Sequence, residues 1–250
     1  MAIQELEKKT EEARKERQKN YHMVEIKNNR EDIRIICERT IDLAEEYYSK
    51  EMDRIPEWSI VSITVISFVK QAVAFLVDRA TKEMNKVTID IGDFITFGIE
   101  YGVTLEADGK DATFNPLTIV GKEMYFDNEN MDNNKLPKDA PNIELTSDIE
   151  TICQGALNTL KSMYGIIIGD WRYVIYIFVS FMRNVKQYLI QHKDQNDSWG
   201  CVINFAEVLD FTIEKCGEED EPAFYVINFG PGKDFKITQK DDDKSENHNQ

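Results

Sequence analysis

Two long stretches of the chain have apolar residues at most positions, from Glu57 to Met84 and from Asp170 to His192. Both are too long for ordinary strands, and their apolar residues fall on several faces of a helix. The pattern predicts two long helices, each covered by other elements on more than one side. Because Lys70 interrupts the first stretch and Arg183 the second, we expect core helices rather than membrane spans, and no membrane partner.

A shorter amphipathic pattern precedes each long stretch, and a strand-like pattern follows it. Apolar residues recur at helical spacing from Ile33 to Ala44 and from Ile149 to Leu160. After the first long helix, apolar and polar residues alternate over 87–91, and Gly92 and Asp93 form a turn to a further strand. The pattern therefore predicts an α+β fold in which two helices and a small antiparallel sheet occur twice.

The two regions also share residues, which indicates an internal repeat. At an offset of 113 residues Trp58 aligns with Trp171 and Phe68 with Phe181. With small gaps, Ile36–Cys37 aligns with Ile152–Cys153, and Phe97 with Phe211. Three segments in the same order predict a duplicated module. The alternative is a chance similarity between two generic amphipathic helices.

The repeat divides the chain into five parts. They are a charged N-terminal extension (1–30), a first module (31–126), a linker rich in Asn, Asp and Pro (127–146), a second module (147–238) and a polar tail (239–250). Charge spacing predicts a helix in the extension, which is either solvated or a strap that docks on a neighbouring subunit. We expect the tail to be disordered.

The net charge and the motifs of the chain limit the partners and activities that we expect. The chain has 250 residues and a formal net charge of −16, which argues against nucleic-acid or anionic-membrane partners. Four cysteines without paired spacing, together with three histidines, predict free thiols and no metal. His192 is expected to be a solvated helix cap. Gly230–Lys233 lacks the first half of a phosphate loop, so we expect no enzyme and no cofactor.

Three short motifs carry a resemblance to a known family. They are Asp93–Ile99 at the turn, Phe114–Thr118, and Gly121–Glu123. On these residues the chain resembles the HU/IHF family of histone-like proteins over 35–126, and more loosely over 149–237. The resemblance implies two HU/IHF-like modules in one chain that form a pseudo-dimer with interleaved helices. It further implies that each sheet extends into a β-arm, with Asn115 and Pro116 at the tip of the first.

The chain departs from the DNA-binding members of that family in its charges. Their arms are basic, and a proline at the tip wedges between base pairs. Here residues 98–126 contain only Lys110 and Lys122 against five acidic residues, and the second arm begins with the acidic run Glu218–Glu221. We therefore do not expect a nucleic-acid partner, and the DNA-wedging role is not transferred to Pro116.

The acidic version of the module is similar to the IHF-fold ring proteins of the portal–tail region of crAss-like bacteriophages. That resemblance implies a non-catalytic virion structural protein, a dodecameric homo-oligomer that contacts the portal and other tail or ring proteins. The alternatives are a DNA-binding architectural protein with a basic patch at 14–19 and, third, an acidic DNA mimic. The candidate structural and interface residues are Trp58, Phe68, Phe97, Asn115, Pro116, Trp171, Phe181 and Phe211.

Overall fold

The computed structural model describes residues 23–26, 30–52, 55, 57–79, 86–92, 95–106, 109–120, 140–195, 200–205, 209–216 and 224–231. The first half contains α2 (Arg30–Tyr48), α3 (Trp58–Arg79), β2 (Lys86–Ile91), β3 (Ile95–Glu106) and β4 (Gly109–Val120). The second contains α4 (Ser147–Tyr164), α5 (Arg172–Gln195), β5 (Gly200–Phe205), β6 (Leu209–Cys216) and β7 (Phe224–Pro231). Strand β1 (Met23–Ile26) precedes both halves. Each half therefore has the order helix, helix and three strands.

Local sequence signals set the ends of α4 and the start of α5. The Thr146 side chain caps α4 by accepting a hydrogen bond from the Ile149 N–H. The helix ends at Gly165, whose φ of +67° is in the left-handed region that favours glycine. Helix α5 begins where the Asp170 carboxylate accepts a hydrogen bond from the Arg172 N–H. The connection between these helices is therefore short and closely defined.

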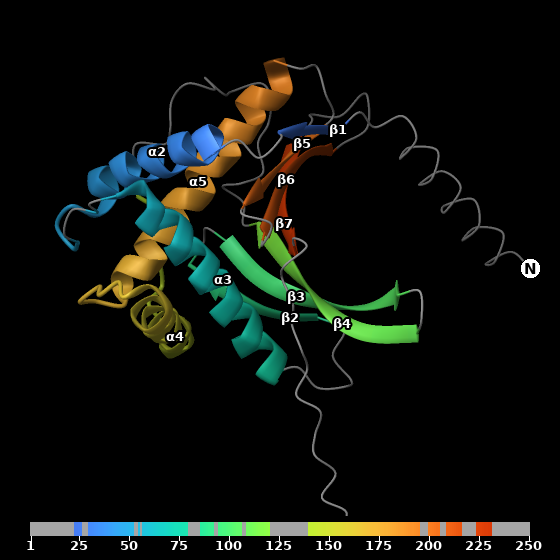
Figure 1. Cartoon of the computed structure of the whole chain (residues 1–250), viewed down its shortest axis with the longest axis horizontal. Helices are drawn as coiled ribbons and strands as arrows, with labels where there is room; N and C mark the ends of the chain where they lie inside the picture. The colour runs from blue at the N-terminus through green and yellow to red at the C-terminus, as the bar shows by residue number, and fades with distance from the viewer. Residues whose placement is uncertain are drawn as a thin grey trace, which may run out of the picture.

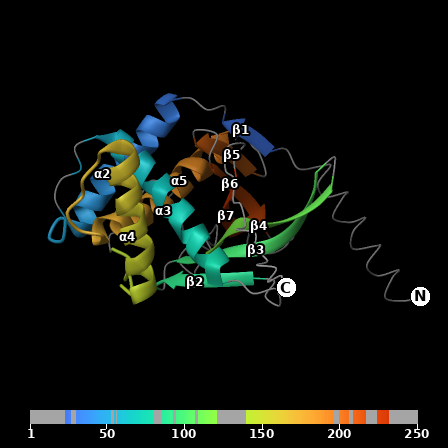
Figure 2. The same ribbon diagram turned by 60° about the horizontal axis from the view of Figure 1, so that its bottom comes forward.

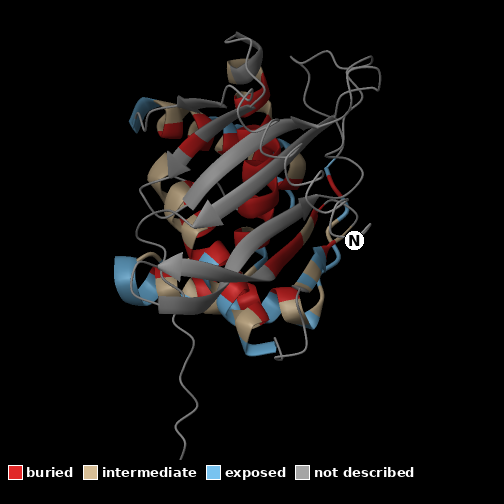
Figure 3. Ribbon diagram, turned by 90° about the vertical axis from the view of Figure 1, so that its right-hand side faces the viewer, coloured by how far each residue is buried: buried red, intermediate tan, exposed pale blue. Residues whose placement is uncertain are grey.

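The helices of the two halves interleave (Figure 1). Helix α2 packs mainly on α5, and α4 packs mainly on α3, so each first helix contacts the other half's long helix more than its own. Helices α3 and α5 also contact each other at the centre. Every residue of α5 from Val174 to Lys186 is buried, and Figure 3 shows the buried residues concentrated in the middle of the molecule. One hydrophobic core therefore joins both halves.

The strands form two sheets on one side of the helical layer (Figures 1 and 2). One sheet has the order β2-β3-β4 and is antiparallel; the other has the order β1-β5-β6-β7, in which β1 alone runs parallel to its neighbour. Strands β4 and β7 lie next to each other. The β3–β4 hairpin extends away from the helices in both views.

Strand β1 corrects the predicted N-terminal helix. Residues Met23–Ile26 pair in parallel with β5, from Met23 opposite Gly200 to Ile26 opposite Ile203. The helix predicted over 1–30 is therefore wrong at this segment. Val24 and Ile26 are β-branched and favour a strand, and the edge of β5 supplies the pairing. Residues 1–22 lie outside the described residues, as does the tail at 239–250.

The position of Asn115 and Pro116 also differs from the prediction. Asn115 pairs with Glu100 and Pro116 with Ile99, in the body of the hairpin, whose last pair is Glu106 and Gly109. The expectation that they form the arm tip is therefore wrong. The Asp108–Gly109 dipeptide is a stronger hairpin signal. A proline is tolerated at this site because β4 is an edge strand of its sheet.

The end of the linker packs on the first half. The side chain of Pro141 is buried, and Ile143 lies against the core. Gly92, at the β2–β3 turn, has a φ of +60°, and a β-carbon built there would lie 2.0 Å from the Asn142 carbonyl oxygen. Only a glycine fits this contact. Residues 127–139 of the predicted linker lie outside the described residues.

Helix α3 is the one helix in the described part of the chain that is long and apolar enough to cross a membrane by length and composition. Half of its most apolar window is buried in the structure, and the core helix of a soluble protein meets the same criterion.

Candidate interaction surface

Three phenylalanines join the two halves at the centre of the core. Phe68 of α3 lies 4.3 Å from Phe178 of α5 between ring centroids, and Phe97 of β3 packs edge-on to both at 6.4 and 6.5 Å. All three side chains are fully buried. Sequence reasoning selected Phe68 and Phe97 and missed Phe178, because Phe178 aligns with Val65 in the repeat rather than with another aromatic residue.

The other predicted residues lie elsewhere. Phe181 is fully buried in α5. Trp58 begins α3, and Trp171 stands just before α5; both are half-buried against the core, about 15 Å along their helices from Phe68 and Phe181. Strand β4 holds Asn115 and Pro116, and β6 holds Phe211. The side chains of these three lie outside the described residues.

Polar contacts between the halves are reciprocal. The Asn184 amide of α5 donates to the Ile36 carbonyl and the Thr40 hydroxyl of α2. The Gln71 amide of α3, which aligns with Asn184 at the offset of 113, donates to the Thr159 hydroxyl of α4 at 3.1 Å. Each long helix thus carries an amide at an aligned position that binds a threonine in the first helix of the other half.

A second reciprocal pair ties the starts of the first helices. Asp148 near the start of α4 forms a bidentate ion pair with Arg79 of α3, at 2.7 and 2.8 Å. Asp32 near the start of α2 accepts a hydrogen bond of 2.6 Å from the Tyr188 hydroxyl of α5. Asp32 and Asp148 align in the repeat, at the offset that relates Cys37 to Cys153. Both contacts connect one half to the other.

Asn184 should contribute more to stability than Gln71, because its side chain is almost completely buried and Gln71 is only half-buried. We expect Asn184→Ala to lower the free energy of unfolding by about 1–3 kcal/mol through loss of buried hydrogen bonds. Gln71→Ala should cost about 1 kcal/mol or less. Urea unfolding followed by circular dichroism measures both. Equal losses would show that burial does not determine the value of these contacts.

The thiols of Cys37 and Cys153 are buried at aligned positions of α2 and α4. Burial raises both pKa values, that of Cys37 to about 12 against a usual 9. We expect neither thiol to react with a thiol reagent at pH 8 until the protein unfolds. Because the folded-state pKa is raised, the stability linked to the neutral thiol of Cys37 is complete below pH 9 and is lost towards pH 12.

Mass mapping of alkylated cysteines before and after addition of denaturant tests this prediction. Rapid labelling of Cys37 or Cys153 in the native protein would contradict the described packing of α2 and α4. The side chains of Cys201 and Cys216 lie outside the described residues, so the prediction concerns Cys37 and Cys153 alone.

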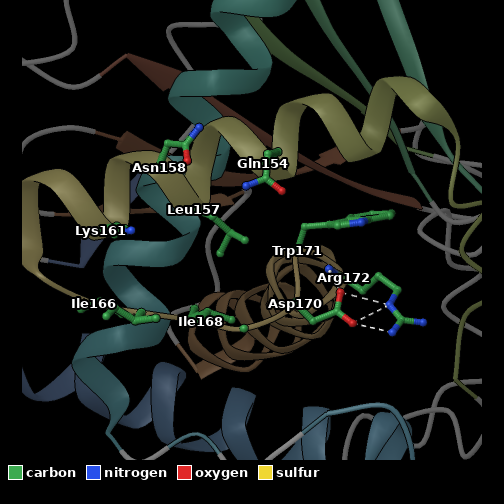
Figure 4. Close-up of a pocket in the computed structure, with 11 residues that line it drawn as sticks. Gln154, Leu157, Asn158, Lys161, Ile166, Ile168, Asp170, Trp171 and Arg172 are labelled. Carbon is green, nitrogen blue, oxygen red and sulfur yellow. Dashed lines mark hydrogen bonds and ion pairs between the residues drawn. The ribbon is translucent and has the colours of Figure 1, made fainter.

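An apolar surface stands out where α4 turns into α5. Of the side chains there, Ile167 is 79% exposed, Met163 70% and Tyr164 48%. Beside them lies a cleft of about 660 Å³ with Leu157 and Trp171 in its walls (Figure 4). We call Met163, Tyr164, Ile167 and this cleft the α4–α5 surface. Large apolar side chains exposed within one short segment are typical of a protein–protein interaction site.

Charged groups stand at the edge of the cleft. Lys161 lies at one side of it and is exposed. At the other side the Arg172 guanidinium donates hydrogen bonds to the Asp170 carboxylate, one of them at 2.9 Å, as Figure 4 shows. This pairing lowers the pKa of Asp170. The cleft therefore combines an apolar wall with a fixed ion pair and an exposed lysine.

The corresponding connection in the first half is different. Met52 and Ile55, between α2 and α3, are buried in the core. In the α4–α5 connection Ile167 is instead exposed, and Ile166 and Ile168 are half-buried. Sequence reasoning missed this surface. Its signal was present, because Ile166, Ile167 and Ile168 stand between two glycines in a connection that is normally polar.

Within the described ranges, no group of three or more His, Cys, Asp or Glu side chains is placed to hold a metal ion. Comparisons with the models of known protein families, with curated proteins and with solved structures found no match to this chain.

Proposed function

We propose that this protein is a non-catalytic structural component of a virion. In this proposal two HU/IHF-like modules form a pseudo-dimer, and copies of the chain assemble into a ring in the portal–tail region through protein–protein contacts. The portal and other tail or ring proteins are its partners, and the virion is its location. The resemblance to the HU/IHF family rests on the motifs Asp93–Ile99, Phe114–Thr118 and Gly121–Glu123.

The reciprocal packing of the two halves is the observation that carries this proposal. Helix α2 packs on α5 and α4 on α3, and aligned residues such as Asn184 and Gln71 make the contacts. In this interleaved arrangement the apolar faces of the long helices are buried within the chain itself. One surface left for partners is the α4–α5 surface, which has the exposed apolar character of a binding site.

The charge of the arms favours protein partners over DNA. A protein that embraces DNA gains affinity mainly from lysines and arginines that replace counterions on the phosphates. Strands β3 and β4 together contain one lysine, Lys110, and three acidic residues, Glu100, Glu106 and Asp111. A hairpin with this charge repels the phosphate backbone.

An electrophoretic mobility shift at physiological salt, combined with negative-stain imaging, tests the proposal. We expect no shift of duplex DNA at about 1 µM protein, the tight end of the usual Kd range for non-specific DNA binding, and we expect ring-shaped particles. A salt-sensitive shift at submicromolar protein would instead support the architectural DNA-binding function. A basic HU-type protein serves as the positive control for binding.

A further inference from the structure

We propose that the α4–α5 surface binds the acidic C-terminal half of α2 on a second copy of this chain, in a head-to-tail contact. This inference rests on the proposed function, because it names the surface through which copies would assemble. Its two sides are different parts of the same chain. One side is apolar with an exposed lysine, and the other side is acidic.

The apolar side is well defined. Ile167 and Met163 are mostly exposed, and the cleft beside them offers Leu157 and Trp171 as its walls. Gly165 and the Asp170 cap hold the connection between the two helices in one conformation. The surface is therefore preorganised, so little conformational entropy would be lost when a partner covers it.

Charge identifies the second copy as the occupant. Residues 154–169, which form the C-terminal part of α4 and the connection, contain Lys161 and no acidic residue, and the Asp170 carboxylate at the cleft edge is paired with Arg172. The aligned part of the first half, residues 38–53, contains six acidic and two basic residues. Asp42 and Glu46 are both exposed and lie one turn apart on α2, between the exposed Arg39 and Lys50. Two regions that align in the repeat thus carry opposite charge, as the two sides of one interface require.

This contact joins unlike surfaces, so it leaves one free surface of each kind at the ends of a row of copies. Such heterologous contacts close into a ring when the rotation between copies permits, whereas a contact between identical surfaces stops at a dimer. The asymmetry between the two halves therefore matters. A perfectly symmetric pseudo-dimer would lack distinct head and tail surfaces.

Two variants remove one side each. Ile167→Asp places a charge on the apolar side, and Asp42→Lys with Glu46→Lys reverses the acidic side. We expect either variant alone to weaken self-association more than tenfold in mass photometry. Leu145→Asp is the matched control, because Leu145 is 40% exposed at the opposite end of α4, and it should leave assembly unchanged. Circular dichroism melts establish that each variant is folded.

Mixing the two defective variants gives the decisive result. Each retains the side that the other lacks, so the mixture should form two-copy species and no larger particles. A mixture that remains single copies, or an Ile167→Asp protein that assembles normally, would overturn this inference and leave the ring proposal intact. A wild-type protein that is a single copy at every concentration would instead contradict the ring proposal itself.

Discussion

Replacement of Phe178 by alanine is expected to lower the free energy of unfolding by about 3–5 kcal/mol, the usual cost of truncating a buried aromatic side chain. The Phe178 ring is fully buried and contacts Phe68 of α3 and Phe97 of β3. Its removal leaves a cavity between the long helices of the two halves. The loss should therefore destabilise both halves together.

Urea unfolding followed by tryptophan fluorescence and by circular dichroism measures this effect. The two transitions should coincide and shift together, because one core joins the halves. Phe178→Leu retains most of the volume and should cost less than half as much. Separate transitions for the two halves, or a loss below about 1 kcal/mol, would contradict the central position of this ring.

Replacement of Gly92 by alanine is expected to cost about 2–4 kcal/mol, which combines two effects. The φ of +60° is strained for any residue with a β-carbon. In addition, that carbon would collide with the Asn142 carbonyl oxygen, so the end of the linker must move away from the β2–β3 turn.

Two other glycines separate these effects. Gly165 has a φ of +67° but open space around it, so Gly165→Ala should show the backbone strain alone, about 1 kcal/mol. Gly169 has open space and no positive φ, so Gly169→Ala should be neutral within about 0.5 kcal/mol. The same urea titration ranks all three. Equal losses at positions 92 and 165 would show that the linker does not press on the turn.

Sequence patterns predicted the helices well because their apolar residues are local and periodic. The helix expected over 57–84 is observed as α3 at Trp58–Arg79, and the one over 170–192 as α5 at Arg172–Gln195. The turn at Gly92 was likewise predicted from its residues, and its positive φ explains why glycine stands there. Elements that are determined by neighbouring residues could therefore be predicted from the sequence.

Features that depend on residues far along the chain could not be predicted from the sequence. Strand β1 has only four residues and forms because β5, far along the chain, offers an edge. Phe178 lies in the apolar run Val174–Val179 of α5, so the periodicity does not distinguish it from its neighbours. The hairpin tip was misplaced because the Asn115–Pro116 motif was given more weight than Asp108–Gly109. Which side chains of the α4–α5 connection face outward is likewise decided by tertiary packing.

The reciprocal contacts connect the fold to the proposed function. If two modules satisfy each other within one chain, a single copy is already complete, and any larger assembly must use outward surfaces. Asp148 with Arg79 and Asp32 with Tyr188 tie the helix starts across the two halves. The α4–α5 surface remains exposed in this arrangement, so it is the feature that most directly calls for a partner.

The mass of the purified wild-type protein in solution distinguishes a closed ring from a single copy. A single copy has a mass of 29.0 kDa. Mass photometry or native mass spectrometry at physiological salt should find one discrete species at a large whole-number multiple of that mass, as a closed ring requires. A protein that stays at 29.0 kDa across all concentrations and shifts duplex DNA in a salt-sensitive manner would contradict assembly into a structural ring.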